Sequence, residues 1–133
     1  MAGTDAKVYL SVIPDKNYFL AEANGYPALD YQALVEQLRS QTDFADYINL
    51  FGTLTLEDYY RTDSHWRQEC LPSVAGTLAA AMDVVLPENS YTEWTLNRPY
   101  YGVYYGYAAL PMEPDRLTYL TTDLLADCTR YNY

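Results

Sequence analysis

The chain has 133 residues, a length that suits one domain with a buried core. Its formal net charge is −10, which argues against nucleic-acid binding and against adhesion to anionic membranes, because both rely on clustered Lys and Arg. Tyrosine accounts for 16 residues, whose rings suit half-buried positions or clefts where the hydroxyl stays hydrated. No stretch reaches the roughly 18–20 apolar residues of a membrane-spanning helix, so we expect no direct insertion of this chain into a bilayer.

The N-terminal part is typical of a strand, a helix and a second strand. Residues 7–13 are β-branched and aromatic and end at Pro14, which predicts a mostly buried strand of a parallel sheet. Residues 30–40 predict a helix with Asp30 as N-cap. Its apolar stripe has helical spacing and consists of Tyr31, Leu34, Val35 and Leu38. Residues 47–51 predict the second strand, so the three elements form a βαβ unit with parallel strands.

The segment after the first strand holds a first group of candidate binding residues. Ligands of open α/β sheets gather beyond the carboxyl ends of the strands, and Asp15, Lys16 and Asn17 follow the first strand directly. Lys16 is therefore a candidate substrate contact. The alternative is that Asp15 and Lys16 only form a solvated turn.

The second half begins with a loop and a helix. Gly52 ends the second strand, and residues 53–66 predict a loop with a short helical turn. Residues 67–83 predict a helix whose core-facing stripe consists of Leu71, Val74, Ala75, Leu78, Ala79 and Met82. Residues 116–121 predict a strand. Residues 91–96 alternate only weakly between apolar and polar side chains and are a further strand candidate.

A tyrosine-rich stretch, residues 99–107, is dense in β-forming residues. With a period of two, Tyr101, Val103, Tyr105 and Tyr107 share one face of a strand. The glycines between the aromatic residues leave slots where a ring or a flat sugar face can lie against the backbone. Tyr101 and Tyr105 are therefore candidate substrate contacts. The alternative is that the aromatic rings cover strand glycines in an ordinary sheet.

The only histidine of the chain lies in a motif that suits acid–base chemistry. Asp63 precedes His65 by two residues, at the connection between the second strand and the following helix. An aspartate that orients an imidazole is two-thirds of an acyl-transfer triad, although an isolated Asp-x-His is usually just a satisfied polar pair. Trp66 is either a wall of this site or a packing residue, and Arg61 is either an anion anchor or an exposed arginine.

The residues around this motif carry a resemblance to a family. Tyr-Tyr-Arg-Thr-Asp-Ser-His-Trp at 59–66, followed by a helix, resembles the signature of the bacterial DHHW family. That family is similar to SGNH-type esterases and to alginate O-acetyltransferases with their Asp-Thr-His-Trp motif. The resemblance extends from the first strand to the end of the chain, with Ser64 where the family name has a second His. It implies catalytic roles for Asp63 and His65.

The nucleophile of such a triad is not evident. Ser64 is adjacent to His65, Ser11 lies within the first strand, Ser73 lies on the helix, and none has a Gly-x-Ser-x-Gly or Gly-Asp-Ser context. In proteins of this resemblance the serine comes later in the chain. We therefore expect a piece of a longer chain that lacks the nucleophile and is inactive alone, with the remainder of the full-length chain as a partner.

The two cysteines and the single histidine predict no metal site and no other cofactor. Cys70 and Cys128 are far apart, and either a disulfide or two free, half-buried thiols is compatible with the sequence. One His and two scattered Cys do not have the spacing of zinc ligands.

The sequence thus predicts a single α/β domain over residues 1–133, with a small mixed, partly parallel sheet and flanking helices, like part of an SGNH hydrolase. Residues 7–86 form its βαβα portion, and residues 87–133 form its tyrosine-rich β segment. The resemblance implies a fragment of an esterase- or O-acyltransferase-type protein that acts on acyl esters of cell-surface polysaccharide outside the cytoplasm. The alternative function is a non-catalytic carbohydrate-binding or structural domain in which Asp63 and His65 only brace a loop.

Overall fold

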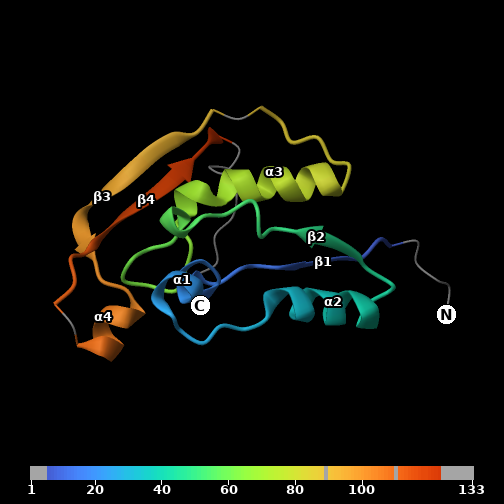
Figure 1. Cartoon of the computed structure of the whole chain (residues 1–133). Coiled ribbons are helices and arrows are strands. Elements are labelled where there is room, and N and C mark those ends of the chain that lie inside the picture. The colour runs from blue at the N-terminus through green and yellow to red at the C-terminus, as the bar shows by residue number, and fades with distance from the viewer. Residues whose placement is uncertain (1–5, 89, 110, 124–133) are drawn as a thin grey trace. The chain divides into compact units, whose positions relative to one another are not determined.

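The structure, a computed structural model, describes residues 6–88, 90–109 and 111–123 and divides into two compact units (Figure 1). The N-terminal unit is Met1–Leu56 and the C-terminal unit is Glu57–Tyr133. The predicted α/β fold class is confirmed, because helices accompany one parallel and one antiparallel pair of strands. Whether the whole chain forms one domain stays a prediction.

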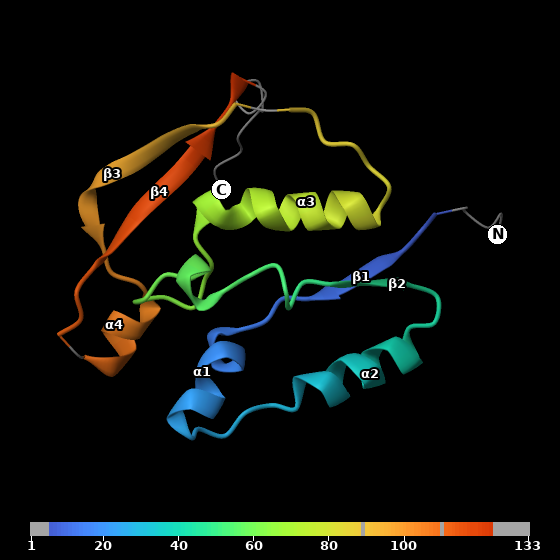
Figure 2. The same cartoon turned by 45° about the horizontal axis from the view of Figure 1, so that its top comes forward.

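The N-terminal unit contains the predicted βαβ arrangement. Strands β1 (Tyr9–Val12) and β2 (Asp46–Asn49) pair in parallel, and α2 (Tyr31–Gln41) connects them and runs alongside them in both views (Figure 2). The Asp30 carboxylate accepts a hydrogen bond from the main-chain N–H of Ala33 at 2.9 Å, which confirms it as the N-cap of α2. β1 is half-buried along its length instead of mostly buried, because within the described residues only β2 pairs with it.

A helix that the sequence analysis missed follows β1. Residues 16–24 form α1 (Lys16–Asn24), a segment for which the sequence analysis predicted no helix. The Asp15 carboxylate caps this helix by accepting from the main-chain N–H of Tyr18 at 3.1 Å. Gly25 ends it with φ of 65°, a left-handed conformation that glycine adopts without steric cost. Capping residues at both ends therefore select a short helix over a turn.

The C-terminal unit contains a helix and an antiparallel hairpin of strands. A 3₁₀ turn at Gln68–Cys70 leads into α3 (Leu71–Ala81), close to the prediction. Of its predicted core stripe, Val74 and Ala79 are buried, whereas Ala75 and Met82 are exposed. Strands β3 (Thr92–Tyr100) and β4 (Asp115–Thr121) pair with an irregular register between Thr95 and Pro99.

The prediction of a strand through the tyrosine-rich stretch is wrong beyond Tyr100. Residues 103–108 form a short helix, α4 (Val103–Ala108), which follows β3 in Figure 2. The main-chain N–H of Gly102 donates to the Thr62 hydroxyl at 2.9 Å, and that of Val103 donates to the Asp63 carboxylate at 3.0 Å. The main-chain N–H of Tyr104 donates to the Thr62 carbonyl at 3.0 Å. These distant acceptors satisfy the N–H groups at the start of a helix, so the segment needs no strand partner.

Both units contain buried side chains among the described residues. In the N-terminal unit they are Pro14, Ala21, Ile48, Leu50 and Leu54. In the C-terminal unit they are Tyr59, Tyr60, Thr62, Asp63, Val74, Ala79 and Thr118. Within the described ranges, no helix combines the length and the apolar character that crossing a bilayer would require.

Candidate acid–base site at Asp63 and His65

A closed loop places Asp63 and His65 next to each other. Tyr59 and Trp66 form an antiparallel β-bridge at its base, and the main-chain N–H of Tyr60 donates to the carbonyl of His65 at 3.1 Å. Trp66 is half-buried in this bridge. The backbone therefore turns back within a few residues, which is what an Asp-x-His spacing needs to bring both side chains together.

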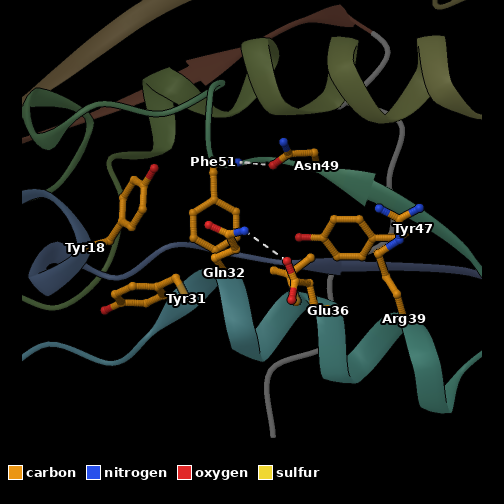
Figure 3. A pocket seen from close by; sticks show the side chains of 9 residues that line it. Tyr18, Tyr31, Gln32, Glu36, Arg39, Tyr47, Asn49 and Phe51 are labelled. Carbon is orange, nitrogen blue, oxygen red and sulfur yellow. Dashed lines mark hydrogen bonds between the residues drawn. The ribbon is translucent and has the colours of Figure 1, made fainter.

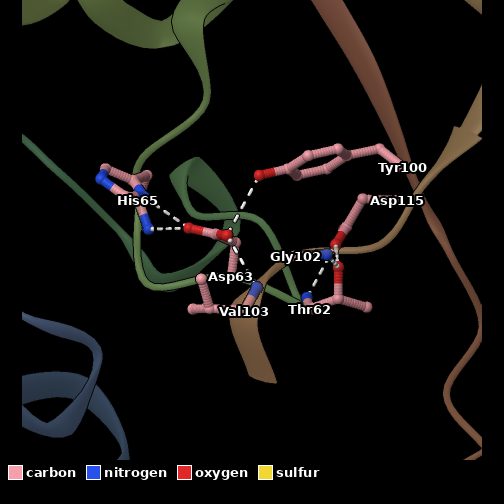
Figure 4. Close-up of polar contacts among 7 residues, drawn as sticks. All are labelled: Thr62, Asp63, His65, Tyr100, Gly102, Val103 and Asp115. Atoms are coloured by element: carbon pink, nitrogen blue, oxygen red, sulfur yellow. Dashed lines mark hydrogen bonds and ion pairs between the residues drawn. The ribbon is translucent and has the colours of Figure 1, made fainter. Parts of the chain in front are cut away.

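The Asp63 side chain is 3% exposed, and its carboxylate accepts four hydrogen bonds (Figure 4). Its Oδ1 accepts from the main-chain N–H of His65 at 3.0 Å and from the His65 Nδ1 at 2.5 Å. Its Oδ2 accepts from the Tyr100 hydroxyl and from the main-chain N–H of Val103, both at 3.0 Å. Residues from the loop, β3 and α4 thus converge on a single carboxylate.

These hydrogen bonds keep Asp63 ionised. Burial alone would raise its pKa, but the donors from His65, Val103 and Tyr100 outweigh burial and hold the pKa well below the ordinary value of an aspartate. The pKa of Tyr100 is raised, first by burial and then by its hydrogen bond to Asp63, so its hydroxyl remains a donor. A fixed negative charge therefore lies beside the imidazole.

His65 presents its ring to solvent while one nitrogen stays bound. Its side chain is 74% exposed, and Figure 4 shows the second ring nitrogen pointing away from Asp63. An ionised carboxylate at Nδ1 requires the proton on that nitrogen, which leaves Nε2 as an acceptor in the neutral ring. The pair can therefore take up a proton at Nε2 and stabilise the resulting imidazolium.

Asp115, the first residue of β4, holds the loop from its other side and was missed by the sequence analysis. It accepts from the main-chain N–H groups of Arg61 and Thr62 at 2.8 and 2.7 Å and from the Thr62 hydroxyl at 2.6 Å. Although burial raises its pKa, these donors and the nearby Arg61 charge lower it below the ordinary value. No local sequence signal connects Asp115 with a loop more than fifty residues earlier.

The other predicted contact residues occupy different places. The Arg61 guanidinium donates to the carbonyl of Glu113 at 2.6 Å. Tyr101 and Tyr105 are 46% and 39% exposed, with ring centroids 4.5 Å apart. Lys16 is the half-buried first residue of α1, in the N-terminal unit. Tyr100, the neighbour of the predicted Tyr101, is the tyrosine that touches Asp63.

No described serine is placed to be activated by His65. Among the described residues, no serine hydroxyl forms a hydrogen bond with the imidazole. Ser64 is exposed, and the Ser73 hydroxyl donates to the carbonyl of Cys70 at 2.8 Å.

The cysteines offer no alternative nucleophile or established crosslink. Burial, and then a hydrogen bond with Asp58, raises the pKa of the Cys70 thiol to about 11, which disfavours the reactive thiolate. Cys128 lies outside the described residues, so its pairing stays untested. Within the described residues no three potential metal-binding side chains cluster together.

Comparison with solved structures identifies proteins that share this fold. A DHHW family protein from Eubacterium siraeum superimposes with a TM-score of 0.72 at 20% identity, covering 89% of this chain and 42% of that one. The O-acetyltransferase domain of Pseudomonas putida AlgJ superimposes with a TM-score of 0.62 at 21% identity, covering 88% of this chain and 49% of that one. The chain shares its fold with both proteins.

This likeness confirms the predicted resemblance at the level of the fold. The chain spans less than half the length of each of the two solved structures. No family model matches the sequence, and no curated protein matches it. The comparisons therefore show the fold and assign no role to an individual residue.

Proposed function

We propose that this chain carries the acid–base part of a serine-type esterase or O-acyltransferase of the DHHW and AlgJ type. The observation that carries the proposal is the exposed imidazole of His65, held at Nδ1 by a buried carboxylate with four hydrogen-bond donors. The second ring nitrogen faces solvent, so it is accessible to the hydroxyl of a nucleophile or a substrate. The fold shared with an O-acetyltransferase domain supports the same reaction class.

In the proposed reaction, Nε2 of His65 removes the proton of a serine hydroxyl as the oxygen attacks an acyl carbonyl. Asp63 keeps the ring oriented and stabilises the imidazolium. The imidazolium then returns the proton to the leaving alcohol, and an acyl-serine remains. Water, or a sugar hydroxyl in a transferase, takes the acyl group in a second step with the same proton transfers.

We assign the nucleophile to polypeptide beyond these 133 residues and the substrate to acylated polysaccharide outside the cytoplasm. The chain covers less than half of each solved structure that it matches, which leaves room for a serine elsewhere. The 133-residue chain should not deacetylate an acetylated oligosaccharide. An unactivated ester is the right probe, because a free imidazole slowly hydrolyses activated esters. Turnover by the chain alone would contradict this assignment.

The test of the site uses the full-length protein with acetylated xylo-oligosaccharide. Asp63→Asn should lower kcat by about 10⁴-fold and His65→Ala at least as much, because both remove the activated base. Ser64→Ala is the matched control, since Ser64 is exposed and adjacent to His65. Equal activity of His65→Ala and the unmodified protein refutes the proposal. Loss of activity in Ser64→Ala would instead identify Ser64, within this chain, as the nucleophile.

A second candidate function is favoured by the exposed tyrosines at α4. Tyr101, Tyr104, Tyr105 and Tyr107 are 37–89% exposed, so their rings are available to stack on sugars. A non-catalytic carbohydrate-binding domain would bind polysaccharide through these rings. In that case binding would survive His65→Ala, be lost in Tyr101→Ala and Tyr105→Ala, and be accompanied by no ester hydrolysis in the full-length protein.

A further inference from the structure

The N-terminal unit holds a pocket that the acid–base site does not use (Figure 3). It has a volume of about 460 Å³, within the range of roughly 300–1,000 Å³ that is typical of small-molecule sites. Its sides come from α1, from one face of α2, and from alternate residues of the segment that begins in β2. Tyr47, Asn49 and Phe51 are two residues apart, so their side chains point to the same face.

Aromatic rings form one end of this pocket in a fixed arrangement. The centroids of Tyr18 and Phe51 are 4.8 Å apart, those of Tyr18 and Tyr31 are 5.1 Å apart, and all contacts are edge-on. Asp15 anchors two of these residues, because its Oδ1 accepts from the Tyr31 hydroxyl at 2.6 Å and from the main-chain N–H of Tyr18. Burial and this hydrogen bond raise the pKa of Tyr31 to about 12, so the hydroxyl stays a donor.

Planar polar groups form the other end. The side-chain amide of Gln32 donates to the Glu36 carboxylate at 3.0 Å, and the Arg39 guanidinium lies 5.9 Å from the ring centroid of Tyr47. Glu36 and Arg39 contribute one negative and one positive charge, so this end of the pocket has no net charge. Asn49 adds a second amide. Figure 3 shows Gln32, Glu36 and Tyr47 in the space between α2 and β2, whereas the Asn49 Oδ1 accepts from the main-chain N–H of Phe51 at 3.0 Å.

This combination matches one class of ligand. An amide, a carboxylate or a guanidinium can form two parallel hydrogen bonds, which fits the neighbouring hydroxyls of a sugar. Aromatic faces fit the C–H faces of the same ring. An anion or a cation would meet an equal charge of its own sign, and a purely apolar ligand would strip water from four polar side chains without replacing their hydrogen bonds.

We propose that the pocket between α2 and β2 is a binding site for a neutral saccharide. The proposal does not rest on the acyl-transfer function, because every residue involved belongs to the N-terminal unit. The sugar ring packs against Tyr18 and Phe51 and forms hydrogen bonds with Gln32, Glu36 and Asn49. The site would hold a segment of glycan independently of any reaction at His65.

The test is a titration of the 133-residue chain with cellotriose, maltotriose and chitotriose, in which saturation-transfer NMR detects binding. Transfer should reach the C–H protons of at least one sugar, which reports contact between the sugar ring and the protein. Tyr18→Ala and Gln32→Ala should weaken its affinity by about tenfold or more, by loss of stacking and of paired hydrogen bonds, respectively. Gln32 is exposed on a helix surface, so this variant reports on binding even if Tyr18→Ala unfolds.

Two matched variants serve as controls on the same unit. Gln37 is an exposed glutamine of α2 and Tyr26 is a 62% exposed tyrosine, and neither lines the pocket. Gln37→Ala and Tyr26→Ala should bind like the unmodified chain. Absence of saturation transfer to all three sugars, or equal weakening by the lining and control variants, overturns the proposal. Neither outcome bears on the esterase activity, so the two proposals fail separately.

Discussion

Gly102 packs its backbone against Asp63 and Thr62 and gives a sharp test of the geometry of the candidate site. A Cβ atom at this position would lie 2.3 Å from the Cβ of Asp63 and 2.5 Å from both the Asp63 Oδ2 and the Thr62 carbonyl oxygen. Its φ of −81° is open to any residue, so the cost of Gly102→Ala is steric and not conformational. The contacts are with the orienting carboxylate and with backbone, neither of which can move without breaking hydrogen bonds.

The expected loss of stability is large for a single methyl group. Overpacking in a closed site costs about 1–3 kcal/mol. Separation of α4 from the loop also breaks two hydrogen bonds. The bond from the Gly102 N–H to the neutral Thr62 hydroxyl contributes about 1 kcal/mol. The bond from the Val103 N–H to the Asp63 carboxylate contributes about 1.5–3 kcal/mol. Because relaxation relieves part of the clash as the bonds break, we expect a net loss of about 2–4 kcal/mol.

Urea denaturation monitored by tyrosine and tryptophan fluorescence measures this loss, and NMR of the single His65 ring reports whether its pairing with Asp63 persists. Gly106→Ala is the control, because a Cβ there meets no atom within 4 Å and the residue lies within α4. This substitution should stabilise the protein by about 0.5–1 kcal/mol. If Gly102→Ala is as stable as the unmodified chain and leaves the His65 resonances unchanged, the packing of α4 on Asp63 is wrong.

Three further predictions concern other parts of the fold. Asp115→Ala should destabilise the chain by about 2–4 kcal/mol in urea, because it leaves the buried Thr62 donors without an acceptor; an unchanged midpoint would contradict this role. The folded-state pKa values of Asp63 and Asp115 lie below the unfolded value of about 3.9, so their contribution to stability is complete above about pH 5 and is lost as the pH falls below about 4. Urea midpoints between about pH 6 and 2 should therefore fall on acidification, and less steeply in Asp63→Asn. Gly25→Ala should lower the free energy of unfolding by about 1–2 kcal/mol, because the φ of Gly25 is 65°. Gly76→Ala, where a Cβ on α3 would lie in open space, should not lower the thermal midpoint. A loss of stability in both variants would exclude the conformational explanation.

The sequence by itself determined the elements whose signals are local. The apolar stripe and the Asp30 cap specify α2, because side chains three and four residues apart share a helix face whatever surrounds them. The parallel pairing of β1 and β2 follows from the helix between them. The contact between Asp63 and His65 is also local, since one tight turn brings residues i and i+2 together.

Only the tertiary structure decided the rest of the site. Residues 103–108 alternate like a strand, yet acceptors on Thr62 and Asp63, about forty residues earlier, make a helix start there. Tyr100 and Asp115 hold the two sides of the loop through hydrogen bonds across 37 and 53 residues. A local pattern contains no information about such partners, because a donor or acceptor gains its role only when folding brings its partner within about 3 Å.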